Sequence, residues 1–521
     1  AARLGEMTPQ NARIWYISPQ EPHNQQAYFV NAPYQVDKIS AAQYSDWQQR
    51  AAHITLSLPA LNPYIPTDFS LIARDGKNYT HPIVLSNDAA MRILWMPSRF
   101  YPDEPKAAIT LALRNKATIG DARQQVLFGL NDYLSSQALD ELNSQASVGG
   151  ISFSVGEDDG LVFNASGFTQ RLPQLLQELV AGYGSFRPDE SQLAQAKSWY
   201  RDRLDAAEKG KAFEQAIQPM QMLSQLPYTQ RDERRRLLPE ITLQEVIAWR
   251  DALLRQATPE MLAVGNLSAR ETETLGATLK AQLQSSERAP WRSDYVVVDK
   301  AIKANLQQAG SSSDSALAAL YVPTGYDEYQ SMAASTLLSQ IIQPWFYNQL
   351  RTEEQLGYAV FTYQMPIGRQ WGIGFLLQSN SRQPAFLLQR FQAFYPQAEQ
   401  RLRSMKPETF AQYQQAMINE LKQRPQTLEE EASRYQRDFS RQNDAFDMRE
   451  KVIAQVQQLT PVRLATFFRQ AIRQQGMAMI SQISGTQERT PQTDYAALPG
   501  FTTWPALAQL QQSLPVKSDT P

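Results

Sequence analysis

The alternation of apolar and polar positions along this chain predicts the same succession of elements twice. A strand opens each succession, at Arg92–Met96 and at Ala316–Val322. A long helix follows each strand, at Asp121–Leu142 and at Tyr329–Arg351, where apolar residues recur at helical spacing. The chain therefore reads as a tandem duplication.

Each long helix leads into a predicted hairpin. Ile151–Val155 is expected to pair with Leu161–Ala165, and Ala359–Tyr363 with Ile373–Leu377. Helices rich in Gln, Glu and Arg fill the middle of each succession, and a last helix and strand close it at 241–268 and at 459–485. We expect an α+β fold of two tandem homologous domains, each a mostly antiparallel sheet covered by helices.

The pattern also places the boundaries. Residues 82–298 form the first repeat and 299–521 the second, and 290–315 are expected to be an exposed linker between them. Residues 1–81 hold a third strand-like ending at Ile14–Ile17 and then a long connector rich in Pro, Asn and Tyr. We interpret 1–81 as the tail of a preceding homologous domain plus an interdomain connector. The start at Ala1, without Met or a signal-peptide pattern, is typical of a mature product or a fragment.

Composition narrows the function. The chain has 521 residues, 42% of them hydrophobic, with 50 Lys and Arg against 52 Asp and Glu. That balance lacks the basic excess expected of a nucleic-acid partner. No apolar run approaches the roughly 18 residues that cross a membrane. Without cysteine, thiolate metal sites and cysteine nucleophiles are excluded.

Histidine is equally restrictive. The three histidines, at 23, 53 and 81, lie outside both repeats and are not spaced as H-E-x-x-H or H-x-x-E-H. We expect lone surface or capping histidines and no metal ligands in this chain. A Ser-His pair would have to borrow a residue from the connector.

The sharpest candidate chemistry is an asymmetry between the repeats. Arg351 and Tyr358 lie where a helix ends and a strand begins, about 208 residues after Asn143 and Gly150 in the same frame. Because the first repeat lacks both side chains, the fold does not require them. Tyr347, four residues before Arg351, lies on the same helical face and could wall a pocket beside it. The alternative to a functional role is a structural one, in which Arg351 pairs with an acid on the helix surface and the ring of Tyr358 is packed in its strand.

At this point the chain resembles a known family. Leu350–Tyr358 is similar to the signature in the C-terminal half of the pitrilysin and insulin-degrading-enzyme family of zinc peptidases. Asn62–Phe69 resembles the interdomain entry segment of that family, and Gly265–Leu267 its turn at the end of a domain. Nearly all 521 residues fit, and bacterial members are the most similar.

The resemblance implies two bowl-shaped halves that close around a chamber, of which this chain is one. Zinc would be bound by the N-terminal half, a partner that carries an H-x-x-E-H helix absent here. Peptides and small proteins would be the substrates. Tyr358 would stabilise the transition state, Arg351 would hold a substrate carbonyl, and Tyr347 would line the pocket after the cleaved bond.

Two functions remain open at this stage. The first is the C-terminal half of a zinc metalloendopeptidase, inactive alone and periplasmic by likeness to the bacterial members. The second is a non-catalytic member of the same fold that acts as an interaction scaffold or regulatory subunit. Arg351 and Tyr358 favour the peptidase, because a scaffold has no use for them.

Overall fold

The computed structural model describes residues 3–518 apart from 56–59, 74, 116–119, 224–225, 227–228, 285–293, 474, 487–494 and 505–506. Contacts between Cα atoms divide the chain into two units, Ala1–Asn62 and Pro63–Pro521. The following paragraphs take each unit by itself.

The small unit has little regular structure. Its elements are η1 (Arg3–Glu6), η2 (Pro9–Asn11), β1 (Gln25–Gln26), β2 (Pro33–Tyr34) and α1 (Ala41–Ala51). The strand expected at Ile14–Ile17 does not form, and its side chains are exposed, Ile17 at 92%. A β-strand is defined by backbone hydrogen bonds to a neighbouring strand, and within the described part of this unit Ile14–Ile17 pairs with none. Helix α1, capped reciprocally by Ser40 and Gln43, was not expected.

The first sheet of the large unit has six strands in the order β3-β4-β8-β5-β7-β6. They are β3 (Ile83–Asn87), β4 (Arg92–Met96), β5 (Lys106–Arg114), β6 (Ile151–Glu157), β7 (Gly160–Phe168) and β8 (Thr258–Gly265). The helices between and after them are α2 (Ala122–Ala138), α3 (Asp140–Val148), α4 (Leu172–Ser185), α5 (Glu190–Glu208), α6 (Ala212–Met222), α7 (Arg231–Leu237), η4 (Leu238–Glu240), α8 (Leu243–Gln256) and α9 (Ala269–Gln282).

The second sheet also has six strands, in the order β12-β13-β11-β14-β10-β15. They are β10 (Ile302–Ala309), β11 (Ser315–Pro323), β12 (Ala359–Ile367), β13 (Gln370–Ser379), β14 (Gly476–Ser484) and β15 (Thr502–Thr503). The other elements of this part are α10 (Glu328–Tyr347), η5 (Asn348–Glu353), α11 (Pro384–Arg403), α12 (Pro407–Lys422), α13 (Leu428–Ser440), α14 (Met448–Gln458), α15 (Pro461–Ile472) and α16 (Leu507–Gln512), with the small ladder of β9 (Asp294–Val296) and β16 (Val516–Ser518).

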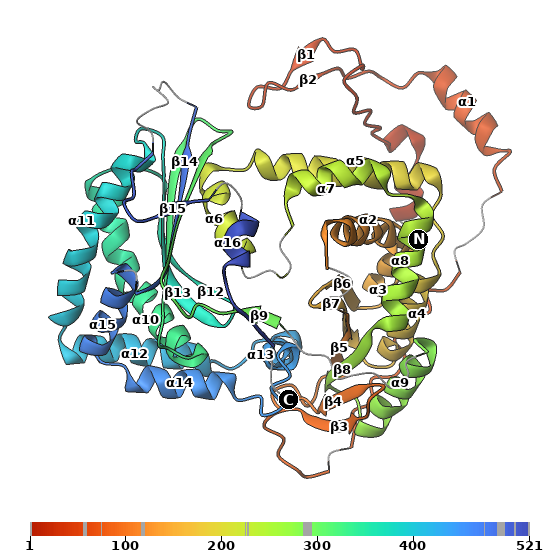
Figure 1. The fold of residues 1–521 in the computed structure, drawn as a ribbon. Coiled ribbons are helices and arrows are strands. Elements are labelled where there is room, and N and C mark those ends of the chain that lie inside the picture. The colour runs from red at the N-terminus through yellow and green to blue at the C-terminus, as the bar shows by residue number, and fades with distance from the viewer. Residues whose placement is uncertain are drawn as a thin grey trace. The chain divides into compact units, whose positions relative to one another are not determined.

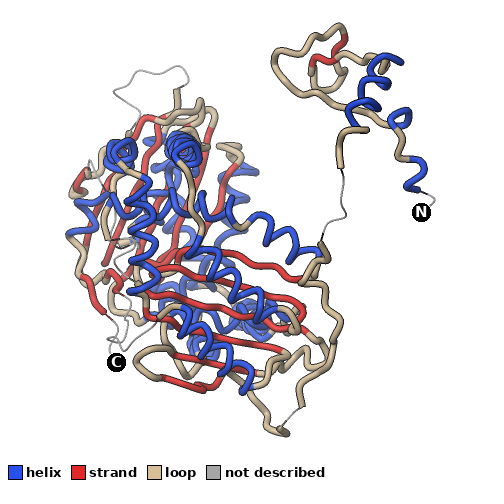
Figure 2. Tube along the Cα trace, turned by 90° about the vertical axis from the view of Figure 1, so that its right-hand side faces the viewer, coloured by secondary structure: helices blue, strands red, loops and turns tan. Residues whose placement is uncertain are grey.

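The strands of the large unit are drawn red in Figure 2. The two six-stranded sheets that they form share one topology. In each, one central pair is parallel, β4 with β8 and β10 with β14, while the next three ladders are antiparallel. Only the outermost strand differs, because β3 runs antiparallel to β4 whereas β15 runs parallel to β10. The predicted α+β fold with two homologous, mostly antiparallel sheets is confirmed. The domain boundaries at 81 and 298 stay predictions.

The two predicted hairpins are correct, whereas the predicted linker is partly wrong. Both hairpins are confirmed, with Val155 opposite Phe163 and Val360 opposite Leu377. The linker at 290–315 is wrong for Ile302–Ala309, which is β10; Pro290 and Trp291 lie outside the described residues. The run of polar residues at the end of β10 hid a strand whose partner, β14, follows about 175 residues later.

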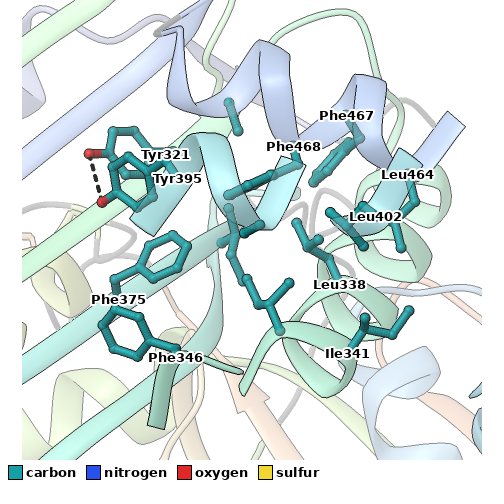
Figure 3. Close-up of a cluster of buried hydrophobic side chains, with 14 of the residues drawn as sticks. Tyr321, Leu338, Ile341, Phe346, Phe375, Tyr395, Leu402, Leu464, Phe467 and Phe468 are labelled. Atoms are coloured by element: carbon teal, nitrogen blue, oxygen red, sulfur yellow. Dashed lines mark hydrogen bonds between the residues drawn. The ribbon is translucent and has the colours of Figure 1, made fainter. Parts of the chain in front are cut away.

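One face of each sheet is covered by helices of its own repeat. In the second repeat α10, α11 and α15 bury one face of β11, β13 and β14. Figure 3 shows this core, where Phe346 packs against Phe375 and the hydroxyls of Tyr321 and Tyr395 lie 3.2 Å apart. In the first repeat α4 and α9 bury the corresponding face.

The opposite face of each sheet is covered by a helix from the other repeat. Helix α13 packs on β5 and β8 of the first sheet, while α6 packs on β11, β13 and β14 of the second (Figure 1). Each sheet is therefore buried on both faces, and the burial of apolar surface ties the two repeats together.

Helix α13 is held to the first repeat by a buried carboxylate. Glu431 has no exposed surface and accepts hydrogen bonds from Ser98 Oγ at 2.6 Å and from the backbone N–H of Arg99 at 2.8 Å. At the other end of α13, Ser440 donates to Asp158 and Gln442 donates to Glu260. Directional hydrogen bonds at both ends fix how α13, a helix of the second repeat, lies on the sheet of the first repeat.

We predict that Glu431→Ala destabilises the protein by roughly 3 kcal/mol, because it leaves the buried hydroxyl of Ser98 and the backbone N–H of Arg99 without their acceptor. The free energy of unfolding in urea measures the effect. Glu429→Ala, an exposed acid in the same helical turn, should cost less than about 1 kcal/mol. Equal costs for the two variants would contradict the role given to Glu431.

Candidate functional site

The segment that carries Arg351 is a π-helix. Helix α10 passes into η5 at Asn348, and the N–H of Glu354 donates to the carbonyl of Gln349 at 3.0 Å, five residues back. Pro344, within α10, already deprives the helix of one regular hydrogen bond near this point. Single π-helical turns are frequent at functional sites, because they place side chains that a regular helix could not.

Arg351 and Tyr358 are brought together. The Cζ atom of Arg351 lies 4.8 Å from the centroid of the Tyr358 ring. A guanidinium over a ring at this distance contributes about 0.5–1 kcal/mol at an exposed site. Tyr358 stands directly before β12 and is 74% exposed, so its hydroxyl is open to a ligand.

Tyr347 lies one turn before Arg351. It is the last residue of α10, and 44% of it is exposed. Its ring is not part of the stacked pair, although its exposure leaves it available to a ligand.

The turn between Arg351 and Tyr358 is anchored by its neighbours. Leu356 is buried and its N–H donates to the carbonyl of Leu350 at 2.9 Å. Gln355 adopts a φ of 53°, the left-handed conformation that reverses the chain. A Cβ atom on Gly357 would lie 1.8 Å from the carbonyl oxygen of Gln378 in β13. Glycine is therefore required at 357 for the chain to approach β13 and enter β12.

Sequence reasoning missed a further part of this turn. Glu354 is joined to Arg390 of α11 by two hydrogen bonds, 2.7 Å from Nε and 2.6 Å from Nη2. These bonds lower the pKa of the Glu354 carboxyl, and the carboxylate in turn raises the pKa of Arg390. The only signal in the sequence was an acid close behind Arg351, because its partner lies 36 residues away.

Two cavities of about 850 and 790 Å³ lie elsewhere. The larger is lined by polar and charged side chains from α2, the β6–β7 turn, α5, α7 and the β12–β13 turn. Neither is lined by Arg351 or Tyr358. Tyr358 is exposed and Arg351 is half-buried.

The residues that the structure describes do not fit a metal ion. Among them there is no group of three His, Asp or Glu side chains close enough to bind one. His23, His53 and His81 are all exposed, as expected for surface histidines, and His81 stacks on Phe446. Within the described ranges, each helix is too short or too polar to cross a bilayer.

Comparison with protein families gives two matches. Residues 1–236 match the model described as the middle or third domain of peptidase M16. Residues 337–436 match domain 4 of the C-terminal lobe of PQQ synthase PqqF-like proteins.

Individual relatives extend the similarity to the whole chain. Protease 3 of Escherichia coli K12 is 57% identical over 518 residues, which cover 99% of this chain and 54% of that protein. Human insulin-degrading enzyme is 22% identical over 479 residues, covering 90% of this chain and 47% of the enzyme. The chain spans about half the length of these curated relatives.

Solved structures agree. The crystal structure of pitrilysin has a TM-score of 0.91 at 57% identity and covers 100% of this chain and 55% of its own. The periplasmic protease PqqL of Escherichia coli has a TM-score of 0.57 at 12% identity, covering 86% of this chain and 51% of its own, which shows a shared fold alone.

We predict that Gly357→Ala destabilises the chain by about 1–3 kcal/mol, because the new methyl group forces β12 away from β13. Urea unfolding measures the loss, and faster hydrogen exchange at Ala359 and Val360 would locate it. Gly156→Ala is the control, since a Cβ atom there meets nothing within 4 Å. Equal stability of both variants would show that the close approach at Gly357 is unimportant.

Proposed function

This chain belongs to the M16 family of peptidases, and we propose that it is the C-terminal half of a zinc metalloendopeptidase. It supplies substrate contacts and transition-state stabilisation to a zinc site in a separate N-terminal half. The substrates are peptides and small proteins, and the compartment is the periplasm, by likeness to the bacterial members of the family.

The stacked pair of Arg351 and Tyr358 carries this proposal. Its Tyr358 is 74% exposed, and the pair is present in only one of two repeats whose sheets share a topology. The first repeat has Asn143 and Gly150 at the matching positions of its sequence frame. A pair that the fold does not require, at a helix end beside an edge strand, is more readily explained by ligand binding than by stability.

The chemistry of the two side chains suits peptide-bond hydrolysis. Attack on the peptide carbonyl places negative charge on its oxygen, and the Tyr358 hydroxyl can donate a hydrogen bond to that oxyanion. Arg351 presents several N–H donors in a rigid fork and can hold a neighbouring backbone carbonyl of the substrate. Tyr347 would line the pocket for the side chain after the cleaved bond.

The exposure of the pair supports a second wall. A hydrogen bond from Tyr358 to an oxyanion is weakened by water, whose high dielectric constant screens the charge. Because Tyr358 is 74% exposed, we infer that an N-terminal half covers it during turnover. The described residues do not fit zinc, so the metal implied by the family resemblance is assigned to that half.

We predict that Tyr358→Phe in the full-length, zinc-bearing enzyme lowers kcat by about 10²–10³-fold, the usual effect of removing one oxyanion donor. Zinc content and melting temperature should not change, because the hydroxyl is exposed. Steady-state kinetics with a peptide substrate measures the loss. Tyr413→Phe on α12 removes a hydroxyl away from the pair and should keep full activity. If the Tyr358→Phe enzyme keeps its turnover, a non-catalytic role as an interaction scaffold would explain the chain better than the proposed catalytic role.

We also predict that the purified chain alone holds less than stoichiometric zinc and does not cleave peptides. Elemental analysis and a fluorogenic peptide assay test both points. Addition of a separately expressed N-terminal half should restore cleavage. One tightly bound zinc per isolated chain would overturn the assignment of the metal.

A further inference from the structure

The Glu354–Arg390 pair joins the π-helical turn to α11. Both N–H groups of the contact come from the same guanidinium, and the two carboxylate oxygens each accept one of them. Such a two-bond contact fixes direction as well as distance. Gln349 adds a third bond, from its Nε2 to Oε1 of Glu354 at 3.2 Å.

The first repeat lacks an Arg–Glu pair at the matching positions of its sequence. In the frame that pairs Leu350 with Leu142, Glu354 corresponds to Ala146, which is buried. In the helices, Leu387-Leu388-Gln389 matches Leu175-Leu176-Gln177, which places Arg390 opposite Glu178. Because the methyl group of Ala146 cannot bind a guanidinium, the ion pair is particular to the repeat that carries Arg351 and Tyr358.

Stability alone does not explain the Glu354–Arg390 ion pair. The side chains of Arg390 and Glu354 are 31% and 22% exposed, and ion pairs that contact water contribute little to the free energy of folding. Apolar residues packed in place of an ion pair are often neutral or stabilising. Unlike this ion pair, an apolar pair could not fix the orientation of the π-helical turn relative to α11.

The backbone conformation of this turn also differs between the two repeats. In the first repeat α3 is a regular helix whose C-cap is Gly149, and the chain reverses at Gly150 with a φ of 74°. In the second, the turn is π-helical and the positive φ falls on Gln355. The reversal thus comes three positions before Tyr358. Tyr358 itself is not among the residues with a positive φ, so its large side chain meets no backbone strain there.

Glu354 is fixed through both its backbone and its side chain. Its N–H closes the π-helical turn on Gln349, and Arg351 lies inside that turn. Its carboxylate is held by α11, which is packed in the second core. A displacement of Glu354 would therefore move Arg351 relative to the Tyr358 ring.

We propose that Glu354 and Arg390 are positioning residues that hold the π-helical turn so that Arg351 stays stacked over Tyr358. This inference rests on the function proposed above for its catalytic consequence. The placement of the pair itself can be tested on the chain alone.

The test replaces the ion pair by an apolar pair, Glu354→Ala with Arg390→Leu. Tyr358 is labelled as 3-fluorotyrosine in the isolated chain, and its ¹⁹F resonance reports the contact with Arg351. We expect the same midpoint of urea unfolding as the parent, together with a shifted and broadened ¹⁹F resonance. In the full-length enzyme we expect kcat to fall at least about 10-fold with a smaller change in KM, because misplaced transition-state contacts lower kcat.

The matched control is Glu399→Ala with Arg403→Leu, an ion pair on the same helix α11. It should change neither the ¹⁹F resonance nor kcat. Should the double variant at Glu354 and Arg390 fail to fold, Arg390→Lys keeps the charge without the fork and should still shift the resonance.

An unchanged ¹⁹F resonance in a folded Glu354 and Arg390 variant would overturn the inference. If the variant loses the contact between Arg351 and Tyr358 but keeps its turnover, Glu354 and Arg390 do position Arg351. That result would count against the catalytic role proposed for Arg351. The failure of the inference and the failure of the proposed function are thereby distinguishable.

Discussion

Each of the two sheets must bury both of its faces, and this requirement shapes the whole large unit. The helices of one repeat cover only one face of its own sheet, so α6 and α13 cross to cover the other. Apolar burial drives this exchange, and the bonds of Glu431, Ser440 and Gln442 give it direction. Because each core contains a helix of the other repeat, neither core is complete without its neighbour.

The exchange reaches the candidate site. Helix α6 belongs to the first repeat, yet its residue Phe213 contacts the ring of Phe361 in β12 and donates its N–H to the side chain of Gln378 in β13. That hairpin begins directly after Tyr358. The edge of the second sheet therefore rests on helices of its own repeat on one face and on a helix of the first repeat on the other. Because both faces of this edge are packed, Tyr358 can be held in place although its side chain is exposed.

The two repeats show how a duplicated scaffold diverges at one place. Apart from the outermost strands β3 and β15, strand order and the parallel pair are the same in both sheets, because they depend on apolar alternation that both repeats keep. The difference is concentrated in the turn before β6 or β12. One repeat has a regular helix, a glycine with positive φ and apolar packing, and the other has a π-helical turn, a stacked pair and an ion pair.

The sequence by itself determined the duplication, the class of fold, both hairpins and the candidates Arg351 and Tyr358, because alternation, turn residues and a comparison of two repeats are local information. Local information also misled: it hid β10 in a linker, placed a strand at Ile14–Ile17, and ran one helix through Leu139, where α2 ends and α3 begins. Only the tertiary structure decided the exchange of α6 and α13, the pairing of Glu354 with Arg390 and the stacking of Arg351 on Tyr358. Each of these depends on a contact whose partner is set by how the chain packs in space, which no pattern along the sequence records.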